Sequence, residues 1–250
     1  MNRPAASIVA LHLFGNALLL WLGYYWLGIG ESDAAHLAWS AAVIVIFTVA
    51  ALWLHGTALV LFNRETESRF TTAARTALRH LPSLTVIAIV ASIVYGLLAW
   101  WRDSFGHSAF VIGSYATMKL RKPVAPSGVL RSFYFLIWLL RWMVVPALLF
   151  RLGASVALNG WRGFRLPLPR PRNRWLFWPA TCALLLCAIW APLKLINWVP
   201  HIEQFALQLA SFLSRLGVGY LLFVGALLAL EFLTSAGKPR LSQPSTVSSP

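Results

Sequence analysis

Six long apolar runs, separated by shorter polar stretches, dominate the pattern along this chain. Each run has about 20 residues or more, which is the length a helix needs to cross roughly 30 Å of hydrocarbon. A helix also satisfies its own backbone hydrogen bonds in lipid. We therefore predict an all-α polytopic integral membrane protein with about six transmembrane helices. The predicted spans are residues 7–29, 36–62, 82–101, 132–152, 175–193 and 216–235.

A shorter helix is predicted between the second and third spans, over residues 66–81. Apolar residues recur there at helical spacing, and the cations Arg69, Arg75 and Arg79 cover much of the remaining surface. This pattern is typical of an amphipathic helix that lies on a membrane surface. We expect Pro82 to end it. The apolar positions are Phe70, Ala74, Ala77, Leu78 and Leu81.

Two segments near the opposite membrane surface depart from a simple pattern. Residues 102–131 contain several Gly and Pro residues, so we predict an outer loop that is only partly ordered. Residues 200–235 are too long for one straight crossing. We therefore expect residues 200–214 to lie along the outer interface, followed by a bend near Gly217 and Gly219.

The composition argues against a soluble domain. Hydrophobic residues make up 59% of the chain and charged residues only 11%, whereas soluble domains carry about 25% charged residues. The polar connections are also too short for an independent domain, which usually needs about 50 residues. We predict a single transmembrane domain over residues 1–236 and a disordered cytoplasmic tail over residues 237–250.

The net charge of +14 could indicate a nucleic-acid partner. The cations, however, lie in the loops between spans, and no nucleic-acid motif accompanies them. One set of alternate loops and termini carries 13 Lys and Arg residues, and the opposite set carries seven. This asymmetry predicts that both termini lie in the cytoplasm. We expect a multi-pass protein of a cell membrane, by default the bacterial plasma membrane, with anionic lipids rather than nucleic acid as partners.

Arg141 is the first candidate for a functional site, because it lies near the middle of the fourth predicted span. A cation at that depth costs about 3 kcal/mol on insertion scales, so it should face the helix bundle. It could anchor a phosphate or carboxylate ligand, or it could fix helix packing through an internal contact. Glu231 is the only carboxylate within a predicted span, so it is the natural partner for Arg141; the alternative is that its side chain extends to the nearby membrane interface.

His12 and His55 are expected at similar depth on the first two spans. Two facing imidazoles can bind a haem iron, although packing hydrogen bonds explain such residues equally well. Asn16 lies one turn from His12 on the same helix face. Together with Glu231, these residues predict a cytoplasm-facing polar pocket that binds a polar headgroup, passes a proton or only packs. The sequence contains no recognisable metal motif, and apart from this haem hypothesis we expect no cofactor.

The stretch of residues 165–174 alternates Pro with Arg. Its proline residues favour an extended path without internal hydrogen bonds. Arg170, Arg172 and Arg174 are therefore candidates for docking anionic lipid or an acidic partner. The alternative is a stiff loop whose charges only set the membrane orientation.

The chain shows no catalytic motif and has only seven acidic residues. Enzymes that act on lipid need a metal cluster, an acid–base pair or an activated nucleophile. We therefore expect a non-enzymatic membrane component, acting in assembly, packing or lipid-surface interaction. A membrane protein is a candidate partner. The alternative is a small transporter or lipid-translocating protein that uses Arg141 and the polar pocket.

Overall fold

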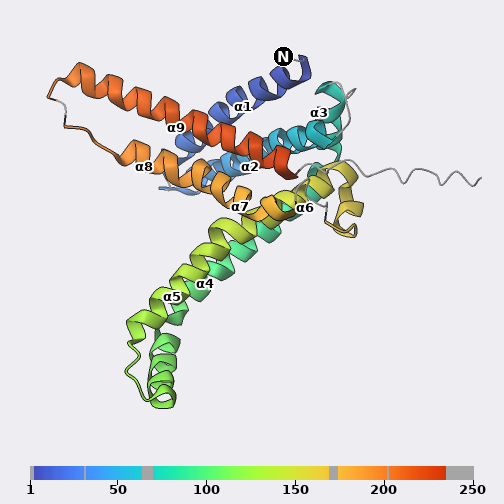
Figure 1. Cartoon of the computed structure of the whole chain (residues 1–250). Helices are drawn as coiled ribbons and strands as arrows, with labels where there is room; N and C mark the ends of the chain where they lie inside the picture. The colour runs from blue at the N-terminus through green and yellow to red at the C-terminus, as the bar shows by residue number, and fades with distance from the viewer. Residues whose placement is uncertain (1–2, 31, 64–69, 169–173, 202, 235–250) are drawn as a thin grey trace, which may run out of the picture.

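The computed structural model of this protein describes residues 3–30, 32–63, 70–168, 174–201 and 203–234. Within these ranges the chain forms helices and no strand (Figure 1). Six helical segments are long and apolar enough to cross a membrane. The predicted all-α polytopic membrane fold is therefore confirmed. The predicted tail, residues 237–250, lies outside the described residues.

The first two spans form a helical hairpin. Its helices are α1 (Arg3–Leu27) and α2 (Ala34–Asn63). Near the connection, the Trp26 indole N–H donates to the Ser40 hydroxyl at 2.8 Å. The side chain of Asp33 caps α2, because its Oδ1 accepts the backbone N–H of His36 at 2.9 Å. The start of the second span is thus set by an aspartate directly before it.

The predicted amphipathic helix is present as α3 (Phe70–Arg79). It packs through small residues, since Ala73 and Ala77 are fully buried. The Trp53 indole N–H of α2 also donates to the carbonyl of Ala74 at 3.2 Å. Phe70 and Leu78, by contrast, are exposed. The next helix, α4 (Leu81–Leu120), begins two residues later with Pro82 in its first turn, where a missing N–H costs nothing.

The second hairpin is much longer than predicted. The expected loop over residues 102–131 is wrong, because α4 continues to Leu120 and the next helix begins at Pro126. Contacts between the two helices stabilise this extension, including the stacked rings of Phe105 and Phe133, whose centroids are 3.5 Å apart. The second arm of the hairpin comprises α5 (Pro126–Leu139), the π-helix η1 (Leu140–Val144), α6 (Val145–Asn159) and the 3₁₀ helix η2 (Gly160–Phe164).

The third hairpin consists of α7 (Arg174–Leu185), the π-helix η3 (Leu186–Trp190), α8 (Ala191–Asn197) and α9 (Phe205–Thr234). The expected interfacial segment and bend before the last span are wrong, since α9 is one helix from Phe205 onward. Contacts with α8 explain this continuity. The Arg215 guanidinium donates to the carbonyl of Ile196 at 3.3 Å, near the end of α8, where carbonyls lack helical partners. Gly219 faces Pro192 and allows the two helices to approach closely.

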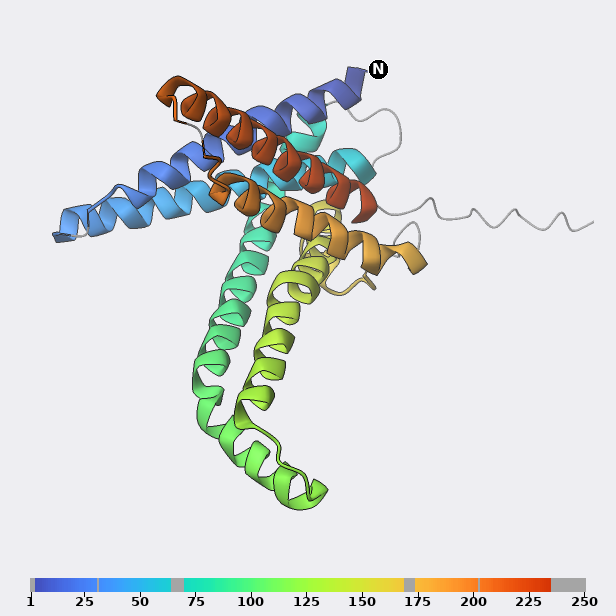
Figure 2. The same cartoon turned by 60° about the vertical axis from the view of Figure 1, so that its left-hand side comes forward.

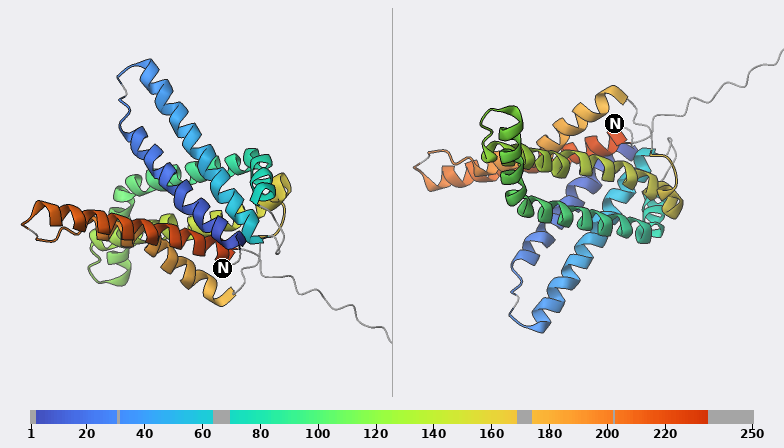
Figure 3. Two further views of the ribbon diagram at one scale, coloured as in Figure 1. Left: turned by 90° about the horizontal axis from the view of Figure 1, so that it is seen from above. Right: turned by 90° about the horizontal axis from the view of Figure 1, so that it is seen from below.

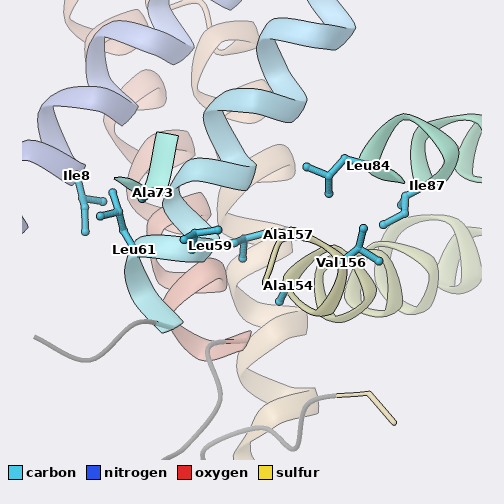
Figure 4. Close-up of a cluster of buried hydrophobic side chains, with 10 residues drawn as sticks. Ile8, Leu59, Leu61, Ala73, Leu84, Ile87, Ala154, Val156 and Ala157 are labelled. Carbon is cyan, nitrogen blue, oxygen red and sulfur yellow. The ribbon is translucent and has the colours of Figure 1, made fainter. Parts of the chain in front are cut away.

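The three hairpins meet at one end of the molecule and diverge toward their connections (Figures 2 and 3). We call the shared end the base. It contains the starts of α1 and α4, the ends of α2 and α9, all of α3, and α6 with η2. Buried apolar side chains from five helices form its core, including Ile8, Leu59, Ala73, Leu84 and Val156 (Figure 4). The start of α1 and the end of α9 share the base, as expected for an even number of spans.

Candidate functional site

A fully buried carboxylate lies at the base, between two imidazole rings. Glu231 of α9 has no exposed side-chain surface, and its Oε1 is 2.8 Å from Nδ1 of His55 on α2. Its Oε2 is 2.8 Å from Nε2 of His12 on α1, which is also fully buried. The centroids of the two imidazole rings are 5.5 Å apart. Three helices from two hairpins therefore converge on one carboxylate.

Close helix packing brings these side chains together. A Cβ atom on Gly15 would lie 2.7 Å from Leu54 Cδ1, so glycine lets α1 and α2 approach closely beside the histidines without moving the Leu54 side chain. The Tyr220 hydroxyl of α9 donates to the carbonyl of Leu13, which ties the third hairpin to α1 next to His12. The local sequence thus supplies both the polar groups and the close approach that buries them.

Asn16 contacts His12 from one turn along α1. Its Nδ2 donates to the carbonyl of His12 at 2.9 Å and lies 3.2 Å from His12 Nδ1. In this orientation Nδ1 is the acceptor, which places the ring proton on Nε2, facing Glu231. The Nε2 and Oε2 atoms are close enough for an ion pair, yet their orientation does not meet hydrogen-bond geometry. Both atoms therefore lack a hydrogen bond among the described residues.

The structure thus brings together four of the five interior residues singled out in the sequence. His12, Asn16, His55 and Glu231 form one group, which we call the polar cluster. The haem hypothesis requires the two imidazoles to lie on opposite faces of a porphyrin ring. Here the Glu231 carboxylate lies between the two imidazoles and contacts both. This geometry leaves no room for a porphyrin ring between them and does not favour a haem.

Arg141 does not join this cluster. The expected Arg141–Glu231 pair is wrong, because the carboxylate contacts His12 and His55 instead. The Arg141 guanidinium carbon lies 5.4 Å from the ring centre of Trp142 and 6.0 Å from that of Tyr95. The Tyr95 hydroxyl donates to the carbonyl of Arg141 at 2.9 Å. The half-buried cation is thus held by aromatic rings, although its buried Nε has no hydrogen bond among the described residues.

Arg141 also lies in η1, a distortion that sequence reasoning missed. The described part of the chain contains two π-helical turns, η1 and η3, and each is followed two residues later by a proline, Pro146 or Pro192. Proline removes one backbone N–H, and its ring crowds the carbonyl four residues earlier, so the preceding turn widens. The signal was the pattern Leu-Leu followed by five residues and Pro, at residues 139–146 and 185–192.

An apolar pocket of about 200 Å³ separates these two turns. Tryptophan side chains from both hairpins line much of it. The lining includes Trp138, Trp142, Met143, Leu186, Ile189 and Trp190. Arg141 is adjacent in the chain to one of these residues but does not line the pocket.

The predicted lipid-contact residues are placed only in part. Arg75 and Arg79 are exposed on α3. Arg69, Arg170 and Arg172 lie outside the described residues, and Arg174 begins α7 without a described side chain. The structure adds the exposed Arg162 of η2 and Arg165 directly after η2, beside Trp161 and Phe164.

Close contacts of His80 hold the end of α6 and the start of η2 beside α3. The imidazole Nδ1–H of His80, which follows α3, donates to the carbonyl of Ala157 at 2.8 Å. Gly160 has a φ of +56°, and a Cβ there would lie 3.0 Å from the His80 ring. Glycine is therefore required for this turn. We call the exposed Arg75, Arg79, Arg162 and Arg165, with Phe70, Leu78, Trp161 and Phe164, the basic surface.

Three ligand atoms of the polar cluster could hold a metal ion. They come from His12, His55 and Glu231 and lie within 4.8 Å of one another. The same atoms could instead share a proton, since an imidazole and a carboxylate exchange one readily. Comparison with protein-family models, curated proteins and solved structures finds no match. The chemistry of the site must therefore be argued from its own geometry.

Proposed function

We propose that this protein is a non-enzymatic integral membrane component whose base binds the anionic surface of a membrane leaflet. The observation that carries the proposal is the basic surface, where four exposed arginines alternate with exposed aromatic and aliphatic side chains. A cation near an anionic leaflet contributes about 1 kcal/mol of binding. Tryptophan is favoured at the depth of the headgroups. Four arginines and Trp161 on one end thus suit an anionic lipid surface.

The charge distribution of the described residues supports this assignment. Among them, the exposed acidic residues Asp33, Asp103 and Glu203 lie away from the base, near the hairpin connections or on the long hairpin. Glu231 is buried inside the base. The interior polar groups contact one another or aromatic rings, as expected for groups that stabilise packing. This arrangement supports a component that acts through its surface in assembly or lipid contact.

We further propose that the base faces the cytoplasm of a cell membrane, by default a bacterial plasma membrane, where the cations meet the anionic leaflet. Single-cysteine labelling tests this orientation. With Cys182 and Cys187 replaced by Ser, Thr71→Cys on α3 should react only from the cytoplasm. Ser32→Cys, between α1 and α2, should react only from outside. Reaction of both cysteines from the same side would refute the orientation.

Lipid selectivity tests the function. The protein would be reconstituted in nanodiscs of phosphatidylcholine with phosphatidylglycerol, and the bound lipid measured by native mass spectrometry. Replacing Arg75, Arg79, Arg162 and Arg165 with Gln should reduce phosphatidylglycerol enrichment and its salt dependence. The matched control replaces four exposed cations at the tip of the second hairpin, Lys119, Arg121, Lys122 and Arg131. Equal losses in both variants, or no loss in either, would contradict the proposal.

A small lipid-translocating protein is the second candidate. The observation that favours it is the apolar pocket between η1 and η3. Near this pocket lies Arg141, whose buried Nε has no hydrogen bond among the described residues. Such a pocket could take an acyl chain while Arg141 contacts a headgroup. In liposomes, this function predicts transfer of fluorescent phospholipid between leaflets that Arg141→Gln abolishes. Transfer no faster than in protein-free liposomes would exclude it.

A further inference from the structure

We infer that the polar cluster is a binding site for a first-row divalent transition-metal ion such as Zn²⁺, held by His12, His55 and Glu231. Two imidazoles and one carboxylate are ligands that Zn²⁺ and its neighbours in the first row accept. The inference does not depend on the proposed lipid function, because the cluster lies inside the base and the basic surface lies outside it.

The geometry of the three ligand atoms fits one small ion. Zinc lies about 2.1 Å from its nitrogen and oxygen ligands, so two ligands of a tetrahedral site are about 3.4 Å apart. The candidate atoms lie within 4.8 Å of one another, with the two carboxylate contacts at 2.8 Å. Small side-chain rotations would therefore centre an ion among them. Three protein ligands would leave a coordination position for water.

The unmet bonding of two buried atoms is an independent reason to expect a cation. His12 Nε2 and Glu231 Oε2 are fully buried and lie 2.8 Å apart, and neither has a hydrogen bond among the described residues. A buried polar atom without a partner costs about 1–3 kcal/mol. A metal ion bound between them would satisfy both atoms and balance the buried negative charge of Glu231.

Asn16 determines how His12 would change on binding. A metal on Nε2 requires the ring proton to lie on Nδ1, where it needs an acceptor. Asn16 Nδ2 is 3.2 Å from Nδ1, so the side chain would have to turn and give up its hydrogen bond to the His12 carbonyl to present its oxygen there. The ring proton that faces Glu231 would then move to Nδ1, and the imidazole would bind the metal in its neutral form.

The site also has a path for an ion. The His55 side chain keeps 27% of its surface exposed, while the side chains of His12 and Glu231 are fully buried. His55 therefore connects the interior of the base to its surface. An ion could be bound first by His55 and then by the two buried ligands.

Cobalt binding tests the inference in the full chain. The protein would be purified in detergent with a tag free of histidine, treated with chelator, and titrated with Co²⁺, whose visible absorption reports its ligands. We expect about one Co²⁺ per chain, displacement by Zn²⁺, and a rise in Tm with Zn²⁺ but not with Mg²⁺. His55→Gln should abolish the absorption bands, and this partly exposed position tolerates substitution better than His12 does.

His36→Gln is the matched control, because His36 contacts Asp33 at an exposed site on the other end of α2. This variant should bind Co²⁺ as the unmodified chain does. If the unmodified chain binds no more Co²⁺ than His55→Gln, or if His36→Gln loses binding equally, the inference is overturned. A cluster that only shares a proton would give that first result.

Discussion

Gly113 of α4 lies directly against Pro126, the first residue of α5. A Cβ on Gly113 would be 3.2 Å from the Pro126 Cα, which is a backbone atom that cannot turn aside. Thr117 supports the same junction, because its hydroxyl oxygen accepts the backbone N–H of Val124 at 2.9 Å. The far end of the second hairpin thus depends on a glycine in the middle of a helix.

Gly113→Ala should therefore destabilise the protein. Alanine favours a helix by about 1 kcal/mol over glycine, but the overlap with Pro126 should cost about 1–3 kcal/mol. The control is Gly106→Ala on the same helix, where no atom lies within 4 Å of the new Cβ. That variant should be neutral or more stable. Thermal unfolding in detergent measures both, and equal effects would show that the contact with Pro126 does not matter.

Glu231→Gln should lower the stability of the base. The amide keeps the shape of the carboxylate but loses its charge, so the contacts with His12 and His55 weaken. We expect a loss of about 1–3 kcal/mol of unfolding free energy, as for other partly broken buried pairs. Glu203→Gln changes an exposed carboxylate and should alter stability by less than about 0.5 kcal/mol.

A double-mutant cycle would show whether His12 and Glu231 act together. The effects of Glu231→Gln and His12→Gln should be non-additive, with a coupling of about 0.5–3 kcal/mol. The same cycle with His36→Gln in place of His12→Gln should show no coupling, since His36 lies at the opposite end of its hairpin. Additive effects in the first cycle would mean that the 2.8 Å contact does not contribute to stability.

Most of the fold could be predicted because each apolar run is long enough for a helix to cross a membrane. The limits of the helices could not, since they depend on contacts between them. The glycines near residue 113 suggested a loop, but Gly113 is where α5 packs on α4. Similarly, Gly219 suggested a bend, whereas it accommodates Pro192.

Depth along the helices explains what was and was not found in the site. His12 and His55 were predicted at similar depth, which depends only on their distance from the ends of their spans. Glu231 was assigned to Arg141 because it is the only carboxylate within a predicted span, although it was also placed in the polar pocket with the two histidines. The sequence could not show that Glu231 contacts His12 and His55 rather than Arg141. That contact depends on how α1, α2 and α9 are rotated about their axes.

The start of α2 should depend on pH through Asp33. The backbone N–H of His36 and then its side chain hold the pKa of the Asp33 carboxyl below its ordinary value of 3.8. A pKa lowered by folding stabilises the folded state above the ordinary value, and this contribution is lost as the pH falls through the folded pKa. The amide hydrogens of the first turn of α2 should therefore exchange faster below about pH 4, after correction for intrinsic rates.

Asp33→Asn separates the charge from the cap. Asparagine is also a good residue before a helix, so this variant should keep the first turn of α2 protected at neutral pH. It should lose the acid-induced change, because it cannot be protonated in this range. Asp33→Ala should expose the first turn at all pH values. Identical pH dependence in Asp33→Asn and the unmodified chain would assign the change to another group.

Arg141→Leu should not destabilise the protein, and its effect should be independent of Glu231. The side chain contacts aromatic rings rather than a carboxylate, and a mid-span cation costs about 3 kcal/mol on insertion scales. Leucine removes that cost and retains apolar contact with Trp142 and Tyr95. In thermal unfolding, Arg141→Leu and Glu231→Gln should add within about 0.5 kcal/mol. A marked coupling between them would instead support an ion pair between Arg141 and Glu231, and would contradict the contacts of Glu231 with the two histidines.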